Sequence, residues 1–190
     1  MRRFVQAGLV TAVGVMLTGA SVSAATVFAT TLSGASEAPA NGSAGTGSAL
    51  VTLAGNTLNV SLTFSGLSTP DVAGHIHCCG PLGVDETVAV PFVGLATGVT
   101  AGSFTGAFDL TNAASYNSTF MSANGGTASA AEAALIAGLN SGMTYVNIHT
   151  AVLPNGEIRG QLGAVPEPAT MMLAGSALAA LALWRRRRLL

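Results

Sequence analysis

The chain contains no lysine, and six of its seven arginines lie near its two ends. Between positions 25 and 164 a single arginine, Arg159, stands against seven carboxylates, which gives this region a formal charge of −6. Proteins that bind nucleic acid or anionic lipid headgroups present clustered Lys and Arg, which displace counterions from the phosphates. The composition therefore excludes nucleic acid as a partner, and divalent cations or neutral sugars suit the central region better.

Motifs of the common catalytic classes are also absent from the sequence. It has no Gly-x-Ser-x-Gly, no phosphate-binding loop and no cysteine within a catalytic-loop signature. The adjacent carboxylates Asp85 and Glu86 fall in an expected loop, where such pairs are more often solvated turn charges than glycosidase acids. We therefore expect a protein that is not an enzyme.

The first 24 residues have the composition of a secretory signal peptide. Met1–Arg3 carry positive charge, and residues 4–19 are apolar apart from one glutamine and two threonines. Val22 and Ala24 then supply the small residues that signal peptidase requires. We expect the general secretory route, cleavage after Ala24 and removal of residues 1–24 from the mature protein.

The C-terminal residues combine a short motif, an apolar stretch and a basic cluster. The motif consists of Val165, Pro166, Glu167 and Pro168. The apolar residues 169–184 follow it and end at Arg185–Arg188. A helix of this length reaches roughly 24–28 Å, close to the bilayer core of about 30 Å. The positive-inside rule keeps the arginines cytoplasmic and the preceding domain periplasmic. A buried core helix, the alternative, would require four arginines to be desolvated.

Residues 165–190 resemble the PEP-CTERM sorting signal of Gram-negative bacteria, in which a Pro-Glu-Pro motif, a short membrane span and a basic tail follow one another. The resemblance implies that an exosortase, an integral membrane enzyme, cuts the tail near this motif. It further implies export through the inner membrane, transient anchoring there, and a destination at the cell surface or in the extracellular matrix. The expected partners are signal peptidase, exosortase, the inner membrane before cleavage, and exopolysaccharide.

Short stretches of alternating polar and apolar residues, separated by turn residues, fill positions 25–164 and predict β-strands. The clearest pair of stretches flanks Gly55 and Asn56, and predicts a hairpin. The expected strands cover residues 26–32, 49–53, 58–64, 75–77, 87–93, 102–110, 145–150 and 157–162. Seven or eight short strands indicate an all-β antiparallel sandwich, placed between the signal helix and the C-terminal transmembrane helix.

One alanine-rich stretch breaks the strand pattern. Residues 128–138 favour a short helix, which Gly138 or Gly142 can end. A second turn motif, Pro-Asn-Gly at 154–156, predicts a closing hairpin between the last two strands.

All three histidines of the chain fall in two of the expected strands. His75 and His77 share one face of a strand opposite Ile76, and His149 lies opposite Ile148 on another strand. If the isoleucines point into the core, the histidines point away from it. Neighbouring strands would then bring the imidazoles together in a site suited to zinc or copper. Alternatively, the histidines hydrogen-bond loop carbonyls.

Two further residue types are candidate additional ligands. Glu157 alternates onto the same polar face as Arg159, and it either ligates the metal or pairs with Arg159 or with the backbone of another strand. Cys78 and Cys79 directly follow a histidine, and can bind a soft metal, form a vicinal disulfide, cross-link chains or stay as inert thiols. Adjacent Cα atoms lie only about 3.8 Å apart across a trans peptide, so a bridge within the pair would be strained.

Three segments of residues 26–162 resemble the CHRD domain family. They are Leu-Ser-Gly-Ala-Ser-Glu-Ala-Pro at 32–39, Gly-His-Ile-His at 74–77, and the stretch from Tyr145 to Leu162. The resemblance implies an immunoglobulin-like β-sandwich over residues 25–164 without established catalysis. The chain departs from the family pattern at Ala38-Pro39-Ala40 and at the cysteine pair, and the second departure leaves the chemistry of the site open.

These observations give one leading functional hypothesis and one alternative. The leading hypothesis is an exported, non-enzymatic binding or structural module of the cell surface or matrix, sorted by an exosortase. The alternative is a secreted protein that binds copper or zinc through His75, His77 and His149. No other cofactor is expected.

Overall fold

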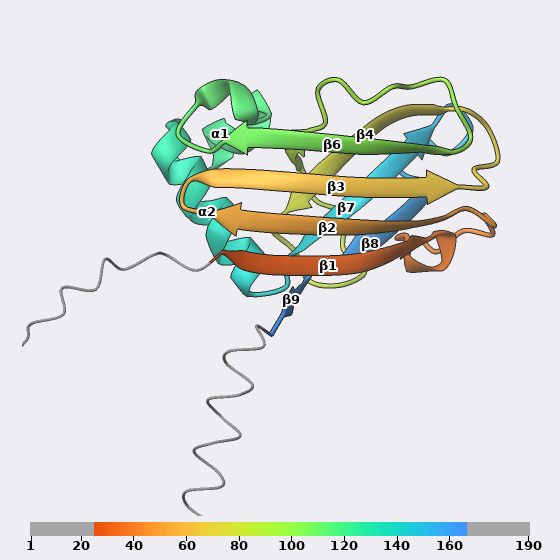
Figure 1. Cartoon of the computed structure of the whole chain (residues 1–190), viewed down its shortest axis with the longest axis horizontal. Helices are drawn as coiled ribbons and strands as arrows, with labels where there is room; N and C mark the ends of the chain where they lie inside the picture. The colour runs from red at the N-terminus through yellow and green to blue at the C-terminus, as the bar shows by residue number, and fades with distance from the viewer. Residues whose placement is uncertain (1–24, 167–190) are drawn as a thin grey trace, which may run out of the picture.

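The computed structural model describes residues 25–166 of the chain (Figure 1). The predicted signal peptide 1–24, with its cleavage position Ala24, lies outside the described residues. So do Glu167 and Pro168 of the sorting motif and the predicted membrane span 169–184. Within residues 25–166, no helix is both long and apolar enough to cross a membrane.

The described residues form one antiparallel sheet of nine strands with two helices at one end. The strands are β1 Thr26–Ser33, β2 Thr46–Ala54, β3 Thr57–Ser65, β4 Asp71–Cys78, β5 Val88–Pro91, β6 Gly102–Asp109, β7 Thr144–Thr150, β8 Ile158–Gln161 and β9 Gly163–Val165. The helices are α1 Ser118–Ala123 and α2 Ala128–Asn140, and 3-10 turns lie at Gly34–Ser36 and Ala113–Ser115. Each of the eight predicted strand segments overlaps an observed strand.

The sheet curls so that its two halves face each other. Its strand order is β5-β4-β7-β8-β1-β2-β3-β6, with β9 also paired to β1. In Figure 1, β4, β7 and β8 pass behind the layer of β1, β2, β3 and β6. The antiparallel all-β prediction is confirmed, and pairing of β8 with β1 joins the two layers into one continuous sheet.

The core between the layers follows directly from strand alternation. Along β3, every second residue is buried, from Leu58 to Phe64, while the residues between them are exposed. The predicted hairpin joins β3 to β2 through Gly55, whose φ of 57° lies in the left-handed region that favours glycine. Ile76, Val146 and Ile148 of the second layer are completely buried in the same core.

Helix α2 confirms the predicted helix, and of the two glycines predicted to end it the structure has Gly142, directly after the C-cap Ser141. The Thr127 side chain caps it by accepting a hydrogen bond from the backbone N–H of Ala130 at 3.2 Å. The helix continues through Gly138, which is buried, and the positive φ of 66° occurs later, at Gly142. Gly138 therefore does not end the helix. The short helix α1 has no counterpart in the sequence prediction, because six residues give no readable period.

Strand β9 brings the two ends of the described domain side by side. Val165 pairs with Val27 in the antiparallel register of β9 and β1. Residues 163–166 are exposed. The first part of the predicted sorting motif, Val165 and Pro166, therefore leaves the domain next to the start of its first strand.

Candidate metal centre

Pairing of β4 with β7 places the three histidines on one face of the sheet. In this register His77 lies opposite Tyr145, His75 opposite Asn147, and His149 opposite Ala73. Side chains at alternate positions share a face, so all three imidazoles lie on the side away from the hydrophobic core. The structure thus brings together residues separated by more than seventy positions in the sequence.

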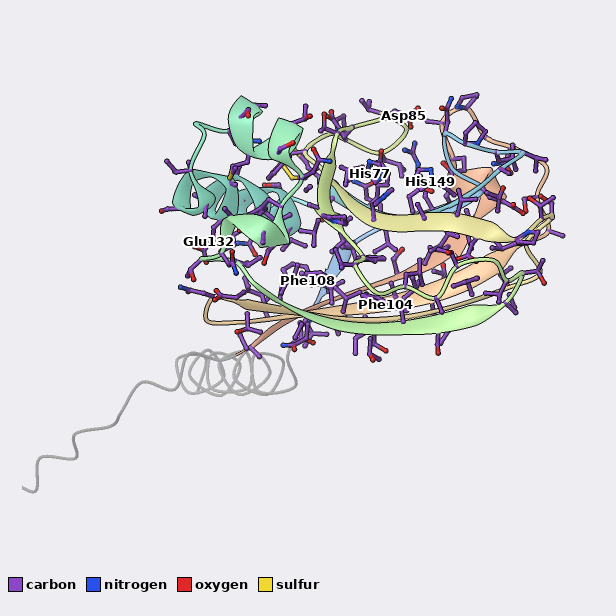
Figure 2. All side chains as sticks on the ribbon, turned by 90° about the horizontal axis from the view of Figure 1, so that it is seen from above. His77, Asp85, Phe104, Phe108, Glu132 and His149 are labelled. Carbon is purple, nitrogen blue, oxygen red and sulfur yellow. A yellow bond between two sulfur atoms is a disulfide. The ribbon has the colours of Figure 1, made fainter. Side chains whose placement is uncertain are left out.

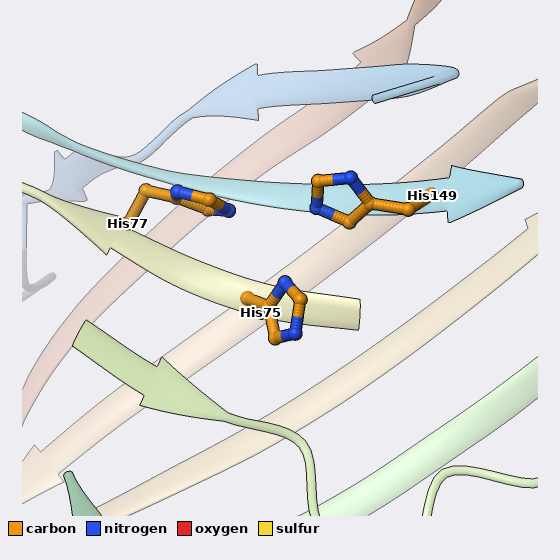
Figure 3. A group of neighbouring side chains, drawn as sticks. All are labelled: His75, His77 and His149. Carbon is orange, nitrogen blue, oxygen red and sulfur yellow. The ribbon is translucent and has the colours of Figure 1, made fainter. Parts of the chain in front are cut away.

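The three rings converge on a common space. One ring nitrogen from each histidine lies within 4.8 Å of the other two. The ring centroids of His75 and His149 are 4.9 Å apart, and those of His77 and His149 are 5.7 Å apart. Figure 3 shows a nitrogen of each ring turned toward this space. Within the described residues, Nδ1 of His75 and Nε2 of both other histidines are buried without a hydrogen-bond partner.

Two backbone carbonyls fix the orientation of two of the rings. Nδ1 of His77 lies 2.7 Å from the carbonyl oxygen of Glu86, and Nδ1 of His149 lies 2.9 Å from that of Pro154. A carbonyl only accepts, so each Nδ1 carries the proton and each Nε2 keeps its lone pair. The predicted contacts to loop carbonyls and the predicted convergence therefore both occur, at different nitrogens of the same rings.

Burial keeps the imidazoles neutral. Desolvation, followed by the neighbouring histidines, lowers the pKa of His75 from 6.5 to about 4. Desolvation also lowers the pKa of His77 to about 4 against the opposing effect of its Glu86 hydrogen bond, and it lowers the pKa of His149. The rings are thus in the form that binds metals at neutral pH.

The spacing fits a metal after a small closure. Bonds of about 2.0–2.1 Å to a tetrahedral zinc place ligand nitrogens about 3.4 Å apart. From separations of up to 4.8 Å, the rings reach this geometry by shifts of about 1 Å, which small side-chain rotations provide. Three nitrogens fill three positions and leave the next one for water or another donor.

Glu157 is not part of the histidine group. It precedes β8 and is completely buried. Its carboxylate accepts hydrogen bonds from the Ser43 hydroxyl at 2.6 Å, the Thr150 hydroxyl at 2.8 Å, and both the backbone N–H and the hydroxyl of Ser68. Burial raises its pKa, but these hydrogen bonds outweigh burial, so the net pKa is lowered. The carboxylate ties three loops together.

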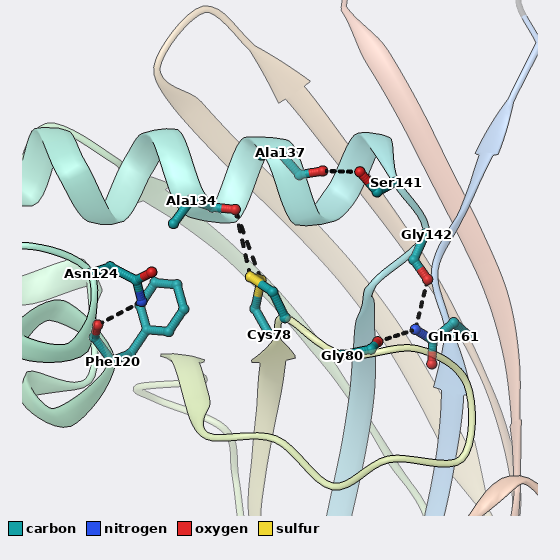
Figure 4. Close-up of a disulfide and its surroundings, with 10 residues drawn as sticks. Cys78, Gly80, Phe120, Asn124, Ala134, Ala137, Ser141, Gly142 and Gln161 are labelled. Carbon is teal, nitrogen blue, oxygen red and sulfur yellow. Dashed lines mark hydrogen bonds between the residues drawn. A yellow bond between two sulfur atoms is a disulfide. The ribbon is translucent and has the colours of Figure 1, made fainter.

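The two cysteines also lie apart from the histidines. Cys78 and Cys79 are joined to each other by a disulfide, with a cis peptide bond between them. Their sulfurs lie 4.0 and 3.6 Å from the carbonyl oxygen of Ala134, against helix α2 (Figure 4). Among the alternatives for this pair, the structure has the vicinal disulfide, and neither sulfur joins the group of three histidines.

Arg159 forms a buried network beside the histidines that the sequence did not predict. Its side chain is 1% exposed, and Nε donates to the Ser36 carbonyl at 2.8 Å. Nη1 donates to Asp85 at 2.9 Å, and the Glu37 carboxylate lies 3.8 Å from Nε. Its guanidinium lies 4.4 Å from the centroid of the Tyr145 ring. Arg159 therefore pairs with Asp85 and Glu37 rather than with Glu157.

The same network corrects the prediction for Asp85. Its side chain is 52% exposed, yet it is an ion-pair partner and not merely a solvated turn charge. In Figure 2, Asp85 lies above His77 and His149, on the side of the sheet away from Phe104 and Phe108. The loop that carries Asp85 and Glu86 thus covers the polar face. The only signal in the sequence was a lone arginine within a strand pattern.

Comparison with known proteins gives two matches that together span most of the chain. The CHRD domain family matches residues 28–162. This chain belongs to the CHRD domain family. The PEP-CTERM protein-sorting motif matches residues 164–188. No curated protein and no solved structure matches the chain.

The sorting motif fixes the cellular context of this CHRD domain. A PEP-CTERM motif implies export through the membrane in Gram-negative bacteria and processing by an exosortase. The histidine centre is therefore carried by an exported protein.

Proposed function

We propose that this CHRD domain is an exported, non-enzymatic module that binds one copper or zinc ion through His75, His77 and His149. After processing, it acts at the cell surface or in the exopolysaccharide matrix. The observation that carries the metal proposal is the set of three buried ring nitrogens, one per histidine, that face one another without hydrogen-bond partners within the described residues.

Unpartnered buried nitrogens are costly, and a metal ion removes the cost. A buried polar atom without a partner costs about 1–3 kcal/mol. Three such atoms around one space would each lower the stability of the folded protein, and no hydrogen bond of theirs would offset the loss. A single cation accepts all three lone pairs at once, and the carbonyls of Glu86 and Pro154 already hold two rings in the required tautomer.

The non-enzymatic role and the surface destination rest on other grounds. The sequence carries no nucleophile motif, and the sorting motif implies export. The structure shows an antiparallel curled sheet. The more specific immunoglobulin-like sandwich, which the family resemblance implies, stays a prediction. The domain would display a bound metal, or bind exopolysaccharide, at its destination.

Metal content of the exported protein tests the proposal. The full chain is expressed without a polyhistidine tag, recovered from the cell envelope in mild detergent, and analysed by elemental mass spectrometry. We expect near one equivalent of copper or zinc, and its loss in a variant with all three histidines changed to alanine. A matched variant with three exposed residues of the other layer changed to alanine (Asn59, Ser61 and Thr105) should keep the metal.

Two outcomes would overturn the proposal. A folded wild-type protein that stays empty after incubation with copper and zinc removes the metal-binding role. An unchanged stoichiometry in the triple-histidine variant places the metal elsewhere. For the destination, Glu167→Ala in the sorting motif should retain the protein in the inner membrane, and normal release of this variant would contradict exosortase sorting.

A further inference from the structure

The donor set of the histidine centre carries no negative charge, and this property bears on which metal it selects. The centre offers three neutral imidazoles, because a metal ion binds the lone pair of an unprotonated ring nitrogen, and the carbonyls of Glu86 and Pro154 already hold two of the rings in that tautomer. Many protein sites for divalent metals combine histidines with carboxylates or thiolates, which offset the charge of the ion. The centre of this CHRD domain lacks that compensation among the described residues.

The potential anionic ligands nearby are committed elsewhere. The Glu157 carboxylate is engaged by four hydrogen-bond donors from Ser43, Ser68 and Thr150. Both cysteine sulfurs are consumed in the disulfide beneath α2. The carboxylate and both sulfurs that the sequence predicted as possible ligands are therefore bonded to other groups in the fold.

The surrounding charges do not replace the missing anion. Asp85 lies near the histidines but is paired with Arg159 at 2.9 Å. Arg159 is itself buried, and its guanidinium lies on the Tyr145 ring that stacks on His77. The positive charge of Arg159 thus offsets the negative charge of Asp85 beside His77.

Burial of the centre raises the free energy of binding a divalent ion more than that of binding a monovalent one. His77 and His149 are 7% and 8% exposed. Transfer of an ion from water to such a site costs free energy that rises steeply with its charge, unless ligands or neighbours neutralise it. A monovalent ion avoids most of this cost.

Coordination number favours the same ion. With three protein nitrogens, Zn²⁺ needs a water or another donor to complete its tetrahedron, and Cu²⁺ needs further donors for its tetragonal arrangement. Cu⁺ is satisfied by three donors. We propose that the three-histidine centre selects monovalent copper over Zn²⁺ and Cu²⁺. This inference rests on the proposed metal-binding function and names its ion.

Anaerobic competition titrations test the selectivity. The exported protein is titrated with Cu⁺ against bicinchoninate, and separately with Zn²⁺ and Cu²⁺ against chromophoric chelators of those ions. The wild type should hold Cu⁺ more tightly than either divalent ion. His75 is the ligand to alter, since it is the most exposed of the three and bonds to no carbonyl within the described residues.

A charge substitution at His75 supplies the sharper comparison. His75→Asp introduces a carboxylate. His75→Asn introduces a neutral amide of nearly the same shape as that carboxylate. Relative to His75→Asn, we expect His75→Asp to raise the ratio of Zn²⁺ affinity to Cu⁺ affinity by roughly ten- to a hundredfold, the range over which groups around a metal alter its binding. Circular dichroism of both variants checks that they are folded.

Each outcome distinguishes this inference from the function on which it rests. Tighter Cu⁺ binding by the wild type, with the Asp variant shifted toward Zn²⁺, supports the inference. Zn²⁺ or Cu²⁺ binding as tight as Cu⁺, or equal ratios in the two variants, overturns the selectivity but leaves metal binding intact. Failure to bind any of the three ions overturns both.

Discussion

The imidazole of His77 stacks on the phenol ring of Tyr145, with centroids 4.7 Å apart and planes within 4° of parallel. Tyr145 holds this place because β7 lies between β4 and β8, so that it pairs with His77 on one side and Gln161 on the other. The Arg159 guanidinium lies against the same ring. A buried arginine is thereby connected to a candidate metal ligand through one aromatic ring.

This stack predicts that Tyr145 positions His77. Tyr145→Leu removes the flat surface on which the imidazole lies, and should lower metal affinity by roughly ten- to a hundredfold, as expected for groups that orient a ligand. Tyr145→Phe keeps the ring and loses only the hydroxyl that accepts from the Glu86 N–H at 2.9 Å. Its affinity should stay close to that of the wild type. Competition titrations with a metal chelator measure both. Equal affinity in the Leu and Phe variants would show that the ring does not orient His77.

Removal of Arg159 should destabilise the protein, because Glu37 and Asp85 then lose the cation with which they pair. Arg159→Met removes the partner of Glu37 and Asp85, and loss of one member of a buried ion pair costs about 3–5 kcal/mol. Urea denaturation of the metal-free protein measures the loss. Adding Glu37→Gln to Arg159→Met should recover part of it, because the carboxylate is then no longer buried without its cation. A double variant as unstable as the single one would contradict this account of the network.

The strands and the common face of the histidines were predictable, because alternation with a period of two is a local property of the chain. Leu58 and Phe64 show it in β3, and His75 and His77 show it in β4. The cover over that polar face was not predictable. It comes from loops whose contacts are distant in sequence, such as the bond of Arg159 to the Ser36 carbonyl.

The prediction of Glu157 as an additional ligand was wrong for a similar reason. Alternation placed Glu157 on the histidine face, but the strand begins one residue later, at Ile158, and the carboxylate turns toward Ser43 and Ser68. Hydroxyl and backbone donors from loops decide its direction, and no period in the sequence encodes them. The ninth strand, Gly163–Val165, was missed because three residues carry too little pattern.

Glu37 predicts a specific pH dependence of stability. Burial, partly opposed by Arg159 and Asn147, raises its pKa from 4.5 to about 7. Between these two values the folded protein holds a proton that the unfolded chain has lost, so this group's contribution to stability falls as pH rises toward 7. The histidine pKa values shift downward and act in the opposite sense, so only a comparison of variants isolates Glu37.

Urea denaturation of the metal-free protein at pH 5 and pH 8 makes that comparison. Glu37→Gln cannot ionise, so its stability relative to the wild type should increase from the lower to the higher pH. Glu132→Gln, the same change at a half-buried residue of α2, is measured beside it as the control for the substitution itself. The same offset for Glu37→Gln at both pH values would mean that the carboxyl titrates normally in the folded protein.

Glu157 should matter for stability and not for metal binding. Glu157→Gln weakens the hydrogen bonds that the carboxylate accepts from Ser43, Ser68 and Thr150, and we expect a loss of about 2–4 kcal/mol, since bonds to charged groups contribute about 1.5–3 kcal/mol each and are not additive. The lowered pKa makes this contribution present above the ordinary value of about 4.5 and lost as pH falls below it. Metal stoichiometry of the folded variant should equal that of the wild type, and a folded but metal-free variant would make Glu157 a ligand after all.

Gly138→Ala should destabilise the protein, although helix propensity alone predicts that it stabilises helix α2. Replacing a glycine inside a helix by alanine ordinarily stabilises a protein by about 0.8–1 kcal/mol. A Cβ at Gly138 would lie 2.5 Å from the Sγ of Cys78 and 2.9 Å from that of Cys79. Helix α2 or the cysteine pair must then shift, so Gly138→Ala should destabilise the protein by about 1–3 kcal/mol. In a background with both cysteines changed to alanine the sulfurs are gone, and the same substitution should be neutral or stabilising. Urea denaturation of the four proteins completes a double-variant cycle, and a gain in stability from Gly138→Ala in both backgrounds would show that α2 does not press on the disulfide.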